Sequence, residues 1–592
     1  MQPSGDFEQK APESGNNDGQ EQQQPQQVVF RSPIQIGIGL QKLGSVRATR
    51  LLEILAAAQY TDDGLAPAVS EQLQTIGVEI KSESRSGAEK LVGLIQKRAP
   101  QTFPSSAAQA EQAKRIELNN RQQEVRLQLI KLAHTGQHAP LMNGGRCSRR
   151  GKPSDAAVVA KDICHVIPKD LSARPKRMYM VCTASDSVGE DVALQLIQDM
   201  LLVAQAEGFQ MHVTAHNVSK DTGKTLTQLA GNHLVICPLD QGLFSCWAED
   251  SGEINADHIR VPARINKNDV PKLEQAIRVD REKRGYRAGI QELDYPEVVR
   301  AINRIGISVA EDGKQAEKAA LATVLERKLV HHQSHIEGGN LLIGTDAGGR
   351  LFALVGKDSV AATRAHLAGA DKELATASVD QQDDHVRKVI GQDLNLPAER
   401  VFFVEQPGQF HLDMGVLLLG NGIVAVNDSR QVLQLTQSWL AEYAAQLVKQ
   451  QICTPAEMDQ ELKRESAKLA KGLQEMARCE AATVRDIVRA SEVIAQTGGK
   501  GLKVLRVPGA YPNSLITSQM NFLNGEIGTS GTGTGYLITN GGSDRRAELA
   551  IADAYLDAQP ALKTIYFVSS GASAASLEKG GGIGCRTKSG TG

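Results

Sequence analysis

The sequence predicts an α/β fold built from repeated units arranged around an axis. From about residue 176 onward, short strand-like runs alternate with amphipathic helical segments. The recurring order is strand, strand, helix, strand, which differs from the simple alternation of one doubly wound sheet. Glycine-rich turns separate the paired strands, so we expect an array of similar modules.

Composition narrows the class of protein before any motif is considered. The chain has 592 residues, which is enough for two or three domains. Its net charge of −2 provides no global field for nucleic acid or an anionic membrane. No apolar run has the length of a membrane span. We therefore expect neither nucleic acid nor membrane as a partner, and the oligomeric state stays open.

The N-terminus and the cysteines bear on location. The opening residues, MQPSGDFEQK, lack the basic and then apolar pattern of a cleaved signal peptide. The eight cysteines are scattered without a C-x-x-C pair, which is typical of reduced thiols. We expect a cytoplasmic protein, or one exported without a cleaved signal peptide.

The first hundred residues divide into a tail and a small domain. Residues 1–27 are rich in Gln and Pro and offer little to bury, so we expect a disordered tail. Within residues 28–100, apolar side chains have helical spacing over 47–60 and 87–98. This pattern predicts a helix-rich accessory domain.

Residues 101–175 are expected to join that domain to the rest of the chain. The run 111–135 predicts one helix. A basic, glycine-containing stretch at 143–155 is typical of a linker. We therefore expect a helix and a linker here, with no part in the site.

The segment 176–592 carries the repeated pattern. Strands are predicted at 178–183, 209–215, 234–238, 340–343, 351–355, 401–404, 416–419, 423–426, 536–538 and 564–569, and helices at 189–207, 385–393 and 545–557. Gly420-Asn421-Gly422 is a strong hairpin signal. Charged, strongly helical sequence at 435–496 interrupts the pattern and predicts a helical insertion.

Five short segments within this region lie beside strand-like runs or glycine turns. They are Trp247–Gly252 (WAEDSG), Glu337–Asn340 (EGGN), Phe410–Met414 (FHLDM), Asn521–Gly525 (NFLNG) and Gly580–Cys585 (GGGIGC). Together they offer a thiol, an imidazole and several carboxylates. This inventory suits covalent attack by Cys on a planar cationic group, with carboxylates holding the cation and His moving protons.

The five segments resemble motifs of arginine deiminases and agmatine deiminases, in the same order. FHLDM is similar to the F-H-L-D-M of the former, and GGGIGC to the G-G-G-I-H-C of the latter. The group is the guanidino-group-modifying superfamily, whose pentein fold is a five-module α/β propeller. The resemblance therefore implies such a catalytic domain over residues 176–592, with the helical insertion at 435–496.

The resemblance also implies catalytic roles for three residues. Cys585 would attack the central carbon of a guanidinium as a thiolate. His411 would protonate the departing amine and then activate water against the S-linked amidino intermediate. Glu337 would hold the imidazole in the required tautomer and raise its pKa.

Three further residues are implied in substrate binding. Asp250 and Asp413 would hold the N–H edges of the guanidinium, because carboxylates bind such edges in bidentate fashion. Glu249 is an alternative to Asp250. Arg364 is a loosely placed candidate for binding the α-carboxylate of an arginine substrate.

The chain departs from the family pattern at two places. Ala248-Glu249 stands where Met-Arg is common, and Gly584 stands where agmatine deiminases have His and arginine deiminases have Arg. The candidate substrates are free arginine, agmatine, another small guanidine and arginine in a protein, and the departures together with the loose match of Arg364 count against free arginine. The departures also leave open an amidinotransferase, and an inactive propeller acting as a binding module.

Two weaker patterns are assigned no function. His331, His332 and His335 form a metal-like cluster, but nothing completes it and a solvated loop is the simpler interpretation. Asp221–Thr225 imitates a phosphate loop, yet Val218 occupies the position of its first glycine. We expect neither a metal nor a cofactor.

Overall fold

The computed structural model describes most of the chain, and its described residues are those in the following ranges. They are 27–31, 35–82, 84–102, 125, 145–148, 159–162, 164–186, 188–239, 246–255, 257–266, 268–285, 318–319, 321–323, 325–406, 411–509, 520–542 and 545–590. The predicted tail at 1–27 and the predicted helix at 111–135 lie almost wholly outside these ranges. The chain divides into two compact units, Met1–Gln123 and Glu124–Gly592.

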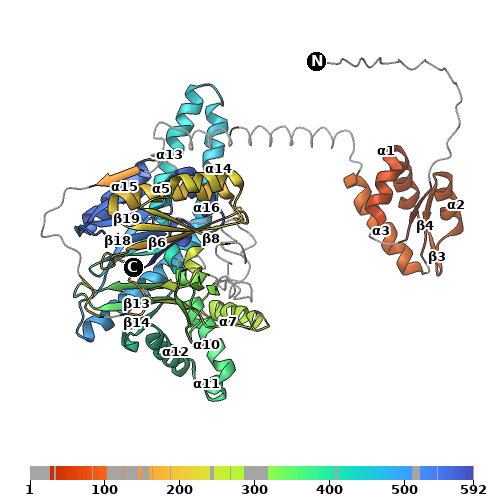
Figure 1. Cartoon of the computed structure of the whole chain (residues 1–592). Coiled ribbons are helices and arrows are strands. Elements are labelled where there is room, and N and C mark those ends of the chain that lie inside the picture. Colours follow the sequence, from red (N-terminus) through yellow and green to blue (C-terminus); the bar gives the residue numbers. More distant parts are fainter. Residues whose placement is uncertain are drawn as a thin grey trace, which may run out of the picture. The chain divides into compact units, whose positions relative to one another are not determined.

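The N-terminal unit is a small α/β domain (Figure 1). Its helices are α1 (Gln35–Ala56), α2 (Pro67–Thr75) and α3 (Arg85–Thr102), and its strands are β1 (Val28–Phe30), β2 (Tyr60–Thr61), β3 (Gly64–Leu65) and β4 (Val78–Ile80). β1 pairs with β4 in parallel, and β2 with β3 as a hairpin. The expected helix-rich domain therefore also contains strand pairs, which are too short to show a period in the sequence.

The C-terminal unit repeats one pairing pattern five times within its described residues. In each repeat a first strand is antiparallel to a second, and the second is parallel to a third that follows a helical crossover. The first-second-third strands are β9–β10–β11, β12–β13–β14, β15–β16–β17, β18–β19–β20 and β21–β6–β7, which we number as repeats 1 to 5. The molecule is thus mixed α/β, as predicted.

The strands of the repeats have the following bounds. They are β9 (Glu253–Ile254), β10 (His258–Val261), β11 (Lys328–His331), β12 (Leu341–Thr345), β13 (Leu351–Gly356), β14 (Val401–Val404), β15 (Val416–Gly420), β16 (Ile423–Asp428), β17 (Lys503–Pro508), β18 (Gly525–Thr529), β19 (Gly535–Thr539), β20 (Leu562–Phe567), β21 (Thr587–Gly590), β6 (Arg177–Thr183), β7 (Gln210–His216) and β8 (Leu234–Leu239). Every predicted strand of this region is present, with ends that differ by a residue or two.

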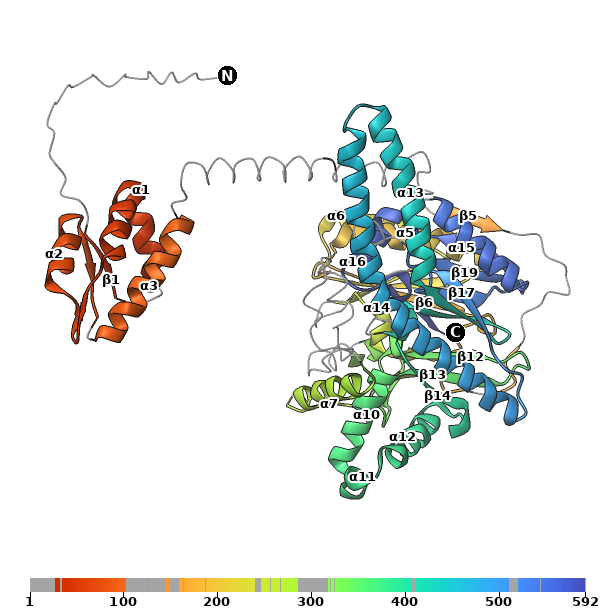
Figure 2. The ribbon, with the colours of Figure 1, turned by 180° about the vertical axis from the view of Figure 1, so that it is seen from behind.

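Helices supply the crossovers and cover the sheets (Figures 1 and 2). They are α5 (Glu190–Glu207), α6 (Lys220–Leu229), α7 (Val270–Lys283), α10 (Lys357–Ala370), α11 (Lys372–Thr376), α12 (Val379–Leu394), α13 (Ser429–Lys449), α14 (Pro455–Gln496), α15 (Arg545–Ala558), α16 (Ser570–Glu578) and α17 (Ile583–Arg586). No helix in the described part of the chain is long and apolar enough to cross a membrane.

The charged helical segment at 435–496 is the crossover of repeat 3. α13 begins at Ser429, directly after β16, and α14 leads into β17. Figure 2 shows α13 and α14 side by side, extending beyond the sheets. Ile487 and Ile494 on α14 are fully buried in a core that β14 and β16 share. The C-terminal half of α14 is therefore a structural part of repeat 3, and the helical insertion stays a prediction for the rest of the segment.

The linker prediction for 143–155 is wrong at its first residues. Gly145–Ser148 forms β5, which pairs antiparallel with β20 at the edge of a sheet. Residues 164–175 also belong to the C-terminal unit, since Asp170 accepts hydrogen bonds from the amide and hydroxyl of Thr345 at 2.6 and 2.8 Å. The boundary at residue 176 is therefore too late. A four-residue edge strand of Gly, Arg, Cys and Ser has no periodicity that the sequence could reveal.

Candidate active site

The five sequence motifs occupy equivalent positions in the five repeats. Each is the turn directly before the first strand of its repeat. These turns are η1 (Ala248–Ser251), η2 (Gly338–Asn340) with Glu337 before it, η4 (Leu412–Met414) with His411 before it, the segment 521–524, and α17. Turns of neighbouring repeats contact one another, so residues far apart in the sequence meet.

Glycines allow these turns to approach closely. A Cβ atom on Gly338 would lie 2.2 Å from the carbonyl oxygen of Glu249, and one on Gly339 would lie 2.4 Å from Nδ1 of His411. Any side chain at either position would therefore displace a neighbouring turn. Asn340 fixes the same junction, because its Oδ1 accepts a hydrogen bond from the Leu412 amide at 3.0 Å.

Cys585 is buried beside Asp413 and Asn524. Its sulfur lies 3.8 Å from Asp413 Oδ2. The side-chain amide of Asn524 donates to both atoms, at 3.2 Å to the sulfur and 2.9 Å to the carboxylate. Asn524 Oδ1 also accepts from the backbone amide of Cys585 at 3.1 Å. The nucleophile proposed from the sequence is thus held by a residue to which the sequence assigned no role.

His411 lies between the thiol and two further acids. Its Nε2 donates to Glu337 Oε2 at 2.9 Å. Ring and carboxylate atoms of His411, Glu337 and Asp250 lie within 4.8 Å of one another. The same limit holds for His411, Asp413 and the Cys585 sulfur. The structure therefore brings five of the six candidate residues into one cluster.

Arg586, the residue directly after Cys585, anchors the turn that bears Cys585. Arg586 is fully buried and binds Asp186 with two hydrogen bonds of 2.7 and 3.1 Å. Its guanidinium carbon lies 4.9 Å from the centre of the Trp247 ring. Trp247 in turn lies against Gly581, where a Cβ would come within 2.6 Å of the indole. These contacts join the turn that bears Cys585 to the turn that bears Asp250.

The surrounding charges shift the ionisation of the cluster. Burial, followed by the carboxylates of Asp413, Asp250 and Glu249, raises the pKa of Cys585 well above its usual value. Burial likewise raises the pKa of Asp413 to about 6. These surroundings favour the neutral thiol of Cys585, and a cation bound beside the carboxylates would oppose that preference.

The pKa of His411 shifts in the opposite direction from that of most buried histidines. Burial lowers its pKa, but the hydrogen bond to Glu337 and the charges of Asp250, Glu337 and Asp413 outweigh burial and raise it. The imidazole is therefore biased toward the protonated form. An imidazolium can donate a proton to a leaving amine. A raised pKa of His411 is therefore the direction expected from the role given to Glu337.

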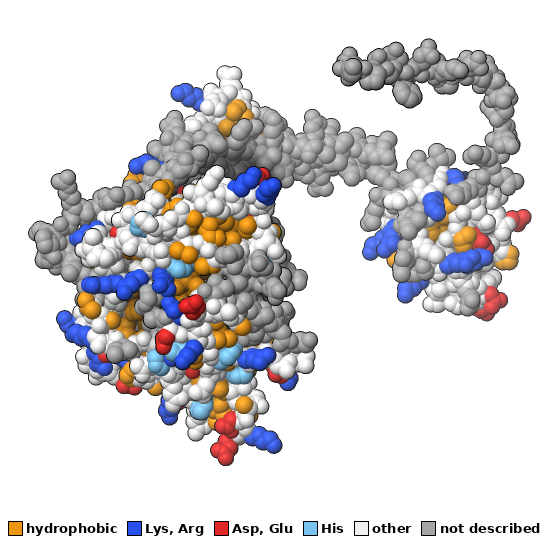
Figure 3. Space-filling view, in the orientation of Figure 1, with side chains coloured by type: hydrophobic (Ala, Val, Ile, Leu, Met, Phe, Trp, Pro, Cys, Tyr) orange, Lys and Arg blue, Asp and Glu red, His pale blue; other side chains and the backbone are white. Residues whose placement is uncertain are grey.

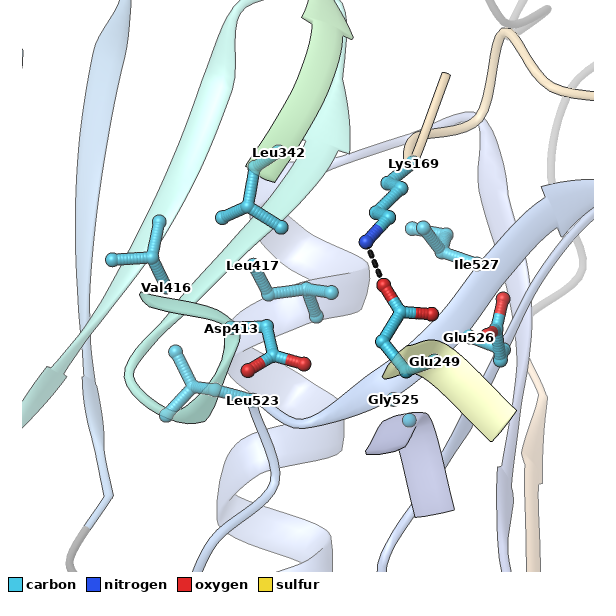
Figure 4. Close-up of a pocket in the computed structure, with 11 residues that line it drawn as sticks. Lys169, Glu249, Leu342, Asp413, Val416, Leu417, Leu523, Gly525, Glu526 and Ile527 are labelled. Atoms are coloured by element: carbon cyan, nitrogen blue, oxygen red, sulfur yellow. Dashed lines mark hydrogen bonds and ion pairs between the residues drawn. The ribbon is translucent and has the colours of Figure 1, made fainter. Parts of the chain in front are cut away.

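Glu249 lies beside the cluster, in a network of largely buried ion pairs. It pairs with Lys169 and, at 3.3 Å, with Lys588, which also pairs with Glu253 at 2.7 Å. Figure 4 shows Glu249 and Lys169 facing each other beside Asp413. Glu249 is therefore committed to lysines, which favours Asp250 for the substrate. Lys169 carries no motif and lies within the predicted linker, so the sequence offered no signal for it.

A small cavity lies beside this network (Figure 4). It has room for about one water molecule. Polar walls come from Lys169, Glu249, Asp413 and Glu526, and apolar walls from strands such as β12 and β15. Burial raises the pKa of Glu526 to about 7.

Arg364 does not join the cluster, so that prediction is corrected. Arg364 lies on α10, and its guanidinium donates to Asp383 at 2.9 and 2.6 Å and to Asp280 at 3.2 Å. These acids lie on α12 and α7, which pack against α10. The side chain is thus committed to joining three helices, and it is not directed toward a substrate carboxylate.

The histidine-rich segment is also not the solvated loop that we expected. His332 and His335 are buried, with exposed fractions of 8% and 2%, and only His331 is exposed. Burial lowers the pKa of His335 to about 4. Among the described residues, the groups whose atoms could hold a metal ion are those of the His411 cluster. The absence of a metal in the working protein stays a prediction.

Comparison with known proteins gives matches at the level of solved structures. No family model and no curated protein sequence matches the chain. The structure is similar to the agmatine deiminase of C. jejuni, with a TM-score of 0.39 and 11% identity over 72% of this chain and 96% of that one. It is similar to the agmatine deiminase of Enterococcus faecalis, with a TM-score of 0.40 and 12% identity over 72% and 95%.

A third similar structure is the provisionally assigned arginine deiminase of Porphyromonas gingivalis, with a TM-score of 0.38 and 12% identity over 72% of this chain and 97% of that one. These three similar proteins are named as agmatine deiminases or as an arginine deiminase.

The visible face of the C-terminal unit carries Lys, Arg, His, Asp and Glu among apolar and uncharged side chains (Figure 3).

Proposed function

We propose that the chain is a cysteine-dependent deiminase that hydrolyses a guanidino group to a ureido group and ammonia. The observation that carries the proposal is the cluster itself. A buried thiol, an imidazole and a carboxylate, from Cys585, His411 and Asp413, lie within 4.8 Å of one another. In this proposal the five repeats form the five modules of a propeller, and the five turns surround its axis.

Binding would use the carboxylates. Asp413 Oδ1 is buried and accepts no hydrogen bond from the described residues. It is therefore available to an N–H edge of a guanidinium, while Asp250 holds a second edge. The cation would offset the acids that raise the pKa of Cys585, so substrate binding would itself promote thiolate formation.

The first chemical step would form a covalent intermediate. The Cys585 sulfur attacks the central guanidinium carbon and forms a C–S bond. The bond between that carbon and a terminal nitrogen breaks, and His411 supplies the proton with which the nitrogen leaves as ammonia. Glu337 keeps the imidazole oriented through the 2.9 Å hydrogen bond.

The second step would release the product. His411, now neutral, takes a proton from water, and the water oxygen attacks the amidino carbon. The C–S bond breaks and returns the electron pair to Cys585 as thiolate. The remaining hydroxyl proton is lost as the ureido C=O forms, and it protonates the ammonia released in the first step. The sum is one guanidinium and one water converted to one ureido group and one ammonium, with no cofactor or metal in the scheme.

The test is a turnover assay with guanidines of different size. The full chain is incubated with arginine, agmatine and an arginine-containing peptide, and ureido product and ammonia are measured. We expect product from at least one, which would also identify the substrate as a small molecule or a protein arginine. A ureido signal absent from all three would overturn the proposal. Amidino transfer to an added amine without ammonia release would instead identify an amidinotransferase.

A further inference from the structure

Four of the five turns in the cluster carry a residue that the proposed chemistry uses. The turn of repeat 4, residues 521–524, carries none, although it occupies the equivalent position before β18. We propose that Asn524 is a further catalytic residue, whose side-chain amide stabilises the Cys585 sulfur as a thiolate and fixes the adjacent Asp413 carboxylate. This inference rests on the proposed function and adds a residue to that same site.

The geometry supports simultaneous contact with both groups. A primary amide nitrogen has two hydrogens, and Asn524 Nδ2 is 3.2 Å from the Cys585 sulfur and 2.9 Å from Asp413 Oδ2. Asn524 is fully buried, so water does not compete for these hydrogens. Its oxygen accepts from the Cys585 backbone amide at 3.1 Å. One side chain therefore fixes the nucleophile at its sulfur and at its backbone.

Asn524 is itself held rigidly. Its backbone amide donates to Asn521 Oδ1 at 3.2 Å, and its carbonyl accepts from Asn540 Nδ2 at 3.0 Å. Asn540 Oδ1 also accepts from the Ile583 amide at 2.9 Å, two residues before the nucleophile. The amide group is thus oriented before any substrate arrives, as electrostatic stabilisation requires.

The glycine-rich run before Cys585 makes room for this amide. A Cβ on Gly582 would lie 2.8 Å from Asn524 Oδ1, and one on Gly584 would lie 3.0 Å from the same oxygen. Gly582 and Gly584 therefore lie against the chain's own asparagines.

The local charges explain why a donor is needed at this point. The thiolate and the ionised Asp413 would lie 3.8 Å apart and repel each other in a buried site. Both must nevertheless be anionic when the guanidinium binds. Two N–H groups placed between them offset the repulsion. The hydrogen bond also leaves Asp413 Oδ1 for the substrate, because Oδ2 is already occupied.

The test measures thiol ionisation rather than turnover. The full chain is alkylated with iodoacetamide, a neutral reagent, across a pH series, and the rate at Cys585 is read by mass spectrometry of its peptide. Asn524→Asp keeps an oxygen for the Cys585 amide and removes the donor. Asn524→Ala removes the donor without adding charge. Under the proposal both variants move the midpoint of alkylation to higher pH by about one unit, which slows labelling about tenfold at a fixed lower pH.

Asn521→Asp is the matched control. Asn521 is an equally buried amide in the same turn, but its Nδ2 donates to the Met414 carbonyl at 3.1 Å and not to the nucleophile. Its midpoint is expected to move less than that of Asn524→Asp, because it adds the same charge in the same turn without removing the donor to the sulfur. An unchanged midpoint in Asn524→Ala would overturn the proposal, since a shift confined to Asn524→Asp would reflect added charge alone. An equal shift in Asn521→Asp would overturn it as well.

The result can be separated from the fate of the proposed function. Iodoacetamide reports the thiolate whether or not any guanidine is turned over. If no guanidine yields product but the midpoint shifts as described, the role of Asn524 stands and the deiminase proposal fails. If turnover occurs but the midpoint is unchanged in both variants, the deiminase proposal stands and Asn524 is a packing residue.

Discussion

At the scale of single residues, the proposed chemistry depends on Cys585. Cys585→Ala should abolish turnover and leave the fold intact, because only one thiol is lost. Cys585→Ser should be nearly as inactive, because a hydroxyl ionises far less readily than a thiol. A haloacetamidine, which carries both a cation and a leaving group, should label Cys585 ahead of the other seven cysteines, as peptide mass spectrometry would show. Even labelling of all eight would contradict the assignment.

The raised pKa of Asp413 predicts how ligand binding depends on pH. Burial raises its pKa to about 6 from an ordinary value of 3.8, so the folded protein binds this proton more readily than the unfolded chain. The carboxylate that binds a cation therefore forms only as the pH rises through about 6. Agmatine binding to Cys585→Ala, measured by calorimetry, should strengthen over that range.

Asp413→Asn in the same background is the control for this prediction. It should bind agmatine weakly at every pH, because an amide cannot balance the cation. Wild-type-like binding by Asp413→Asn, or binding that weakens as the pH rises, would contradict the role of this carboxylate. The free energy of unfolding depends on pH in the opposite direction from ligand binding. Protonated Asp413 stabilises the fold fully below pH 3.8, and that contribution is lost as the pH rises through about 6.

The variant Gly584→Ala tests whether close packing sets the position of Cys585. A methyl group on Gly584→Ala would lie 2.9 Å from the Gly525 amide nitrogen and 3.0 Å from Asn524 Oδ1. We expect a loss of about 1–3 kcal/mol in the free energy of unfolding, measured in urea, together with slower labelling of Cys585. Gly531→Ala is the control, because no atom lies within 4 Å of its added Cβ. Equal behaviour of the two variants would exclude crowding as the reason for Gly584.

At the scale of elements, buried ion pairs join the turns to the strands behind them. Glu249 on η1 pairs with Lys588 on β21 and with Lys169, and its exposed fraction is 2%. Glu249→Gln leaves the buried Lys588 and the partly buried Lys169 without their full counter-charge. We expect this to cost about 3–5 kcal/mol of unfolding free energy in urea denaturation.

Asp221→Asn supplies the exposed counterpart. Asp221 lies 3.6 Å from Lys224 at the start of α6, and both side chains are largely exposed. Its loss should change the unfolding free energy by less than about 1 kcal/mol. A Glu249→Gln effect as small as this would mean that the network does not stabilise the turns.

Elements also show where sequence patterns carry structural information. β14, β15 and β16 are continuous apolar runs bounded by turn residues, so their bounds could be read almost to the residue. β9 and β21 are short and rich in polar residues, and they are buried only because neighbouring repeats cover them. No local pattern marks such strands.

At the scale of the whole molecule, repeat 5 is assembled from both ends of the C-terminal unit. Its first strand, β21, pairs antiparallel with β6, which lies more than 400 residues earlier by the numbering of their paired residues, such as Thr587 and Met180. The described sheet also extends from β21 to β9 of repeat 1. The turn that carries Cys585 is thus positioned by the strand that closes the array.

This architecture predicts where the chain can be shortened. Removing residues 1–123 should leave a folded C-terminal unit with the activity of the full chain, because no described site residue lies there. Removing residues 1–150 also removes β5 from the edge of β20, so it should lower stability and expose that edge. Thermal unfolding and turnover of both truncations would check this. Loss of activity on removing 1–123 would show that the N-terminal unit contributes to the site.

The sequence by itself determined the repeated α/β pattern, the bounds of the apolar strands, and the motif residues Cys585, His411, Glu337, Asp413 and Asp250. These signals are local, because strand-forming runs, glycine turns and reactive side chains can be recognised from neighbouring residues alone. Whether the motif residues act as proposed is a question for the variants above.

Only the tertiary structure decided which of these groups meet and what surrounds them. It directed Arg364 to acids on neighbouring helices, buried His332 and His335, and brought Lys169 and Asn524 to the cluster. A lysine in a polar stretch and an asparagine in a turn are ordinary in any sequence. Their environment here is set by contacts between repeats hundreds of residues apart, and no local pattern encodes such contacts.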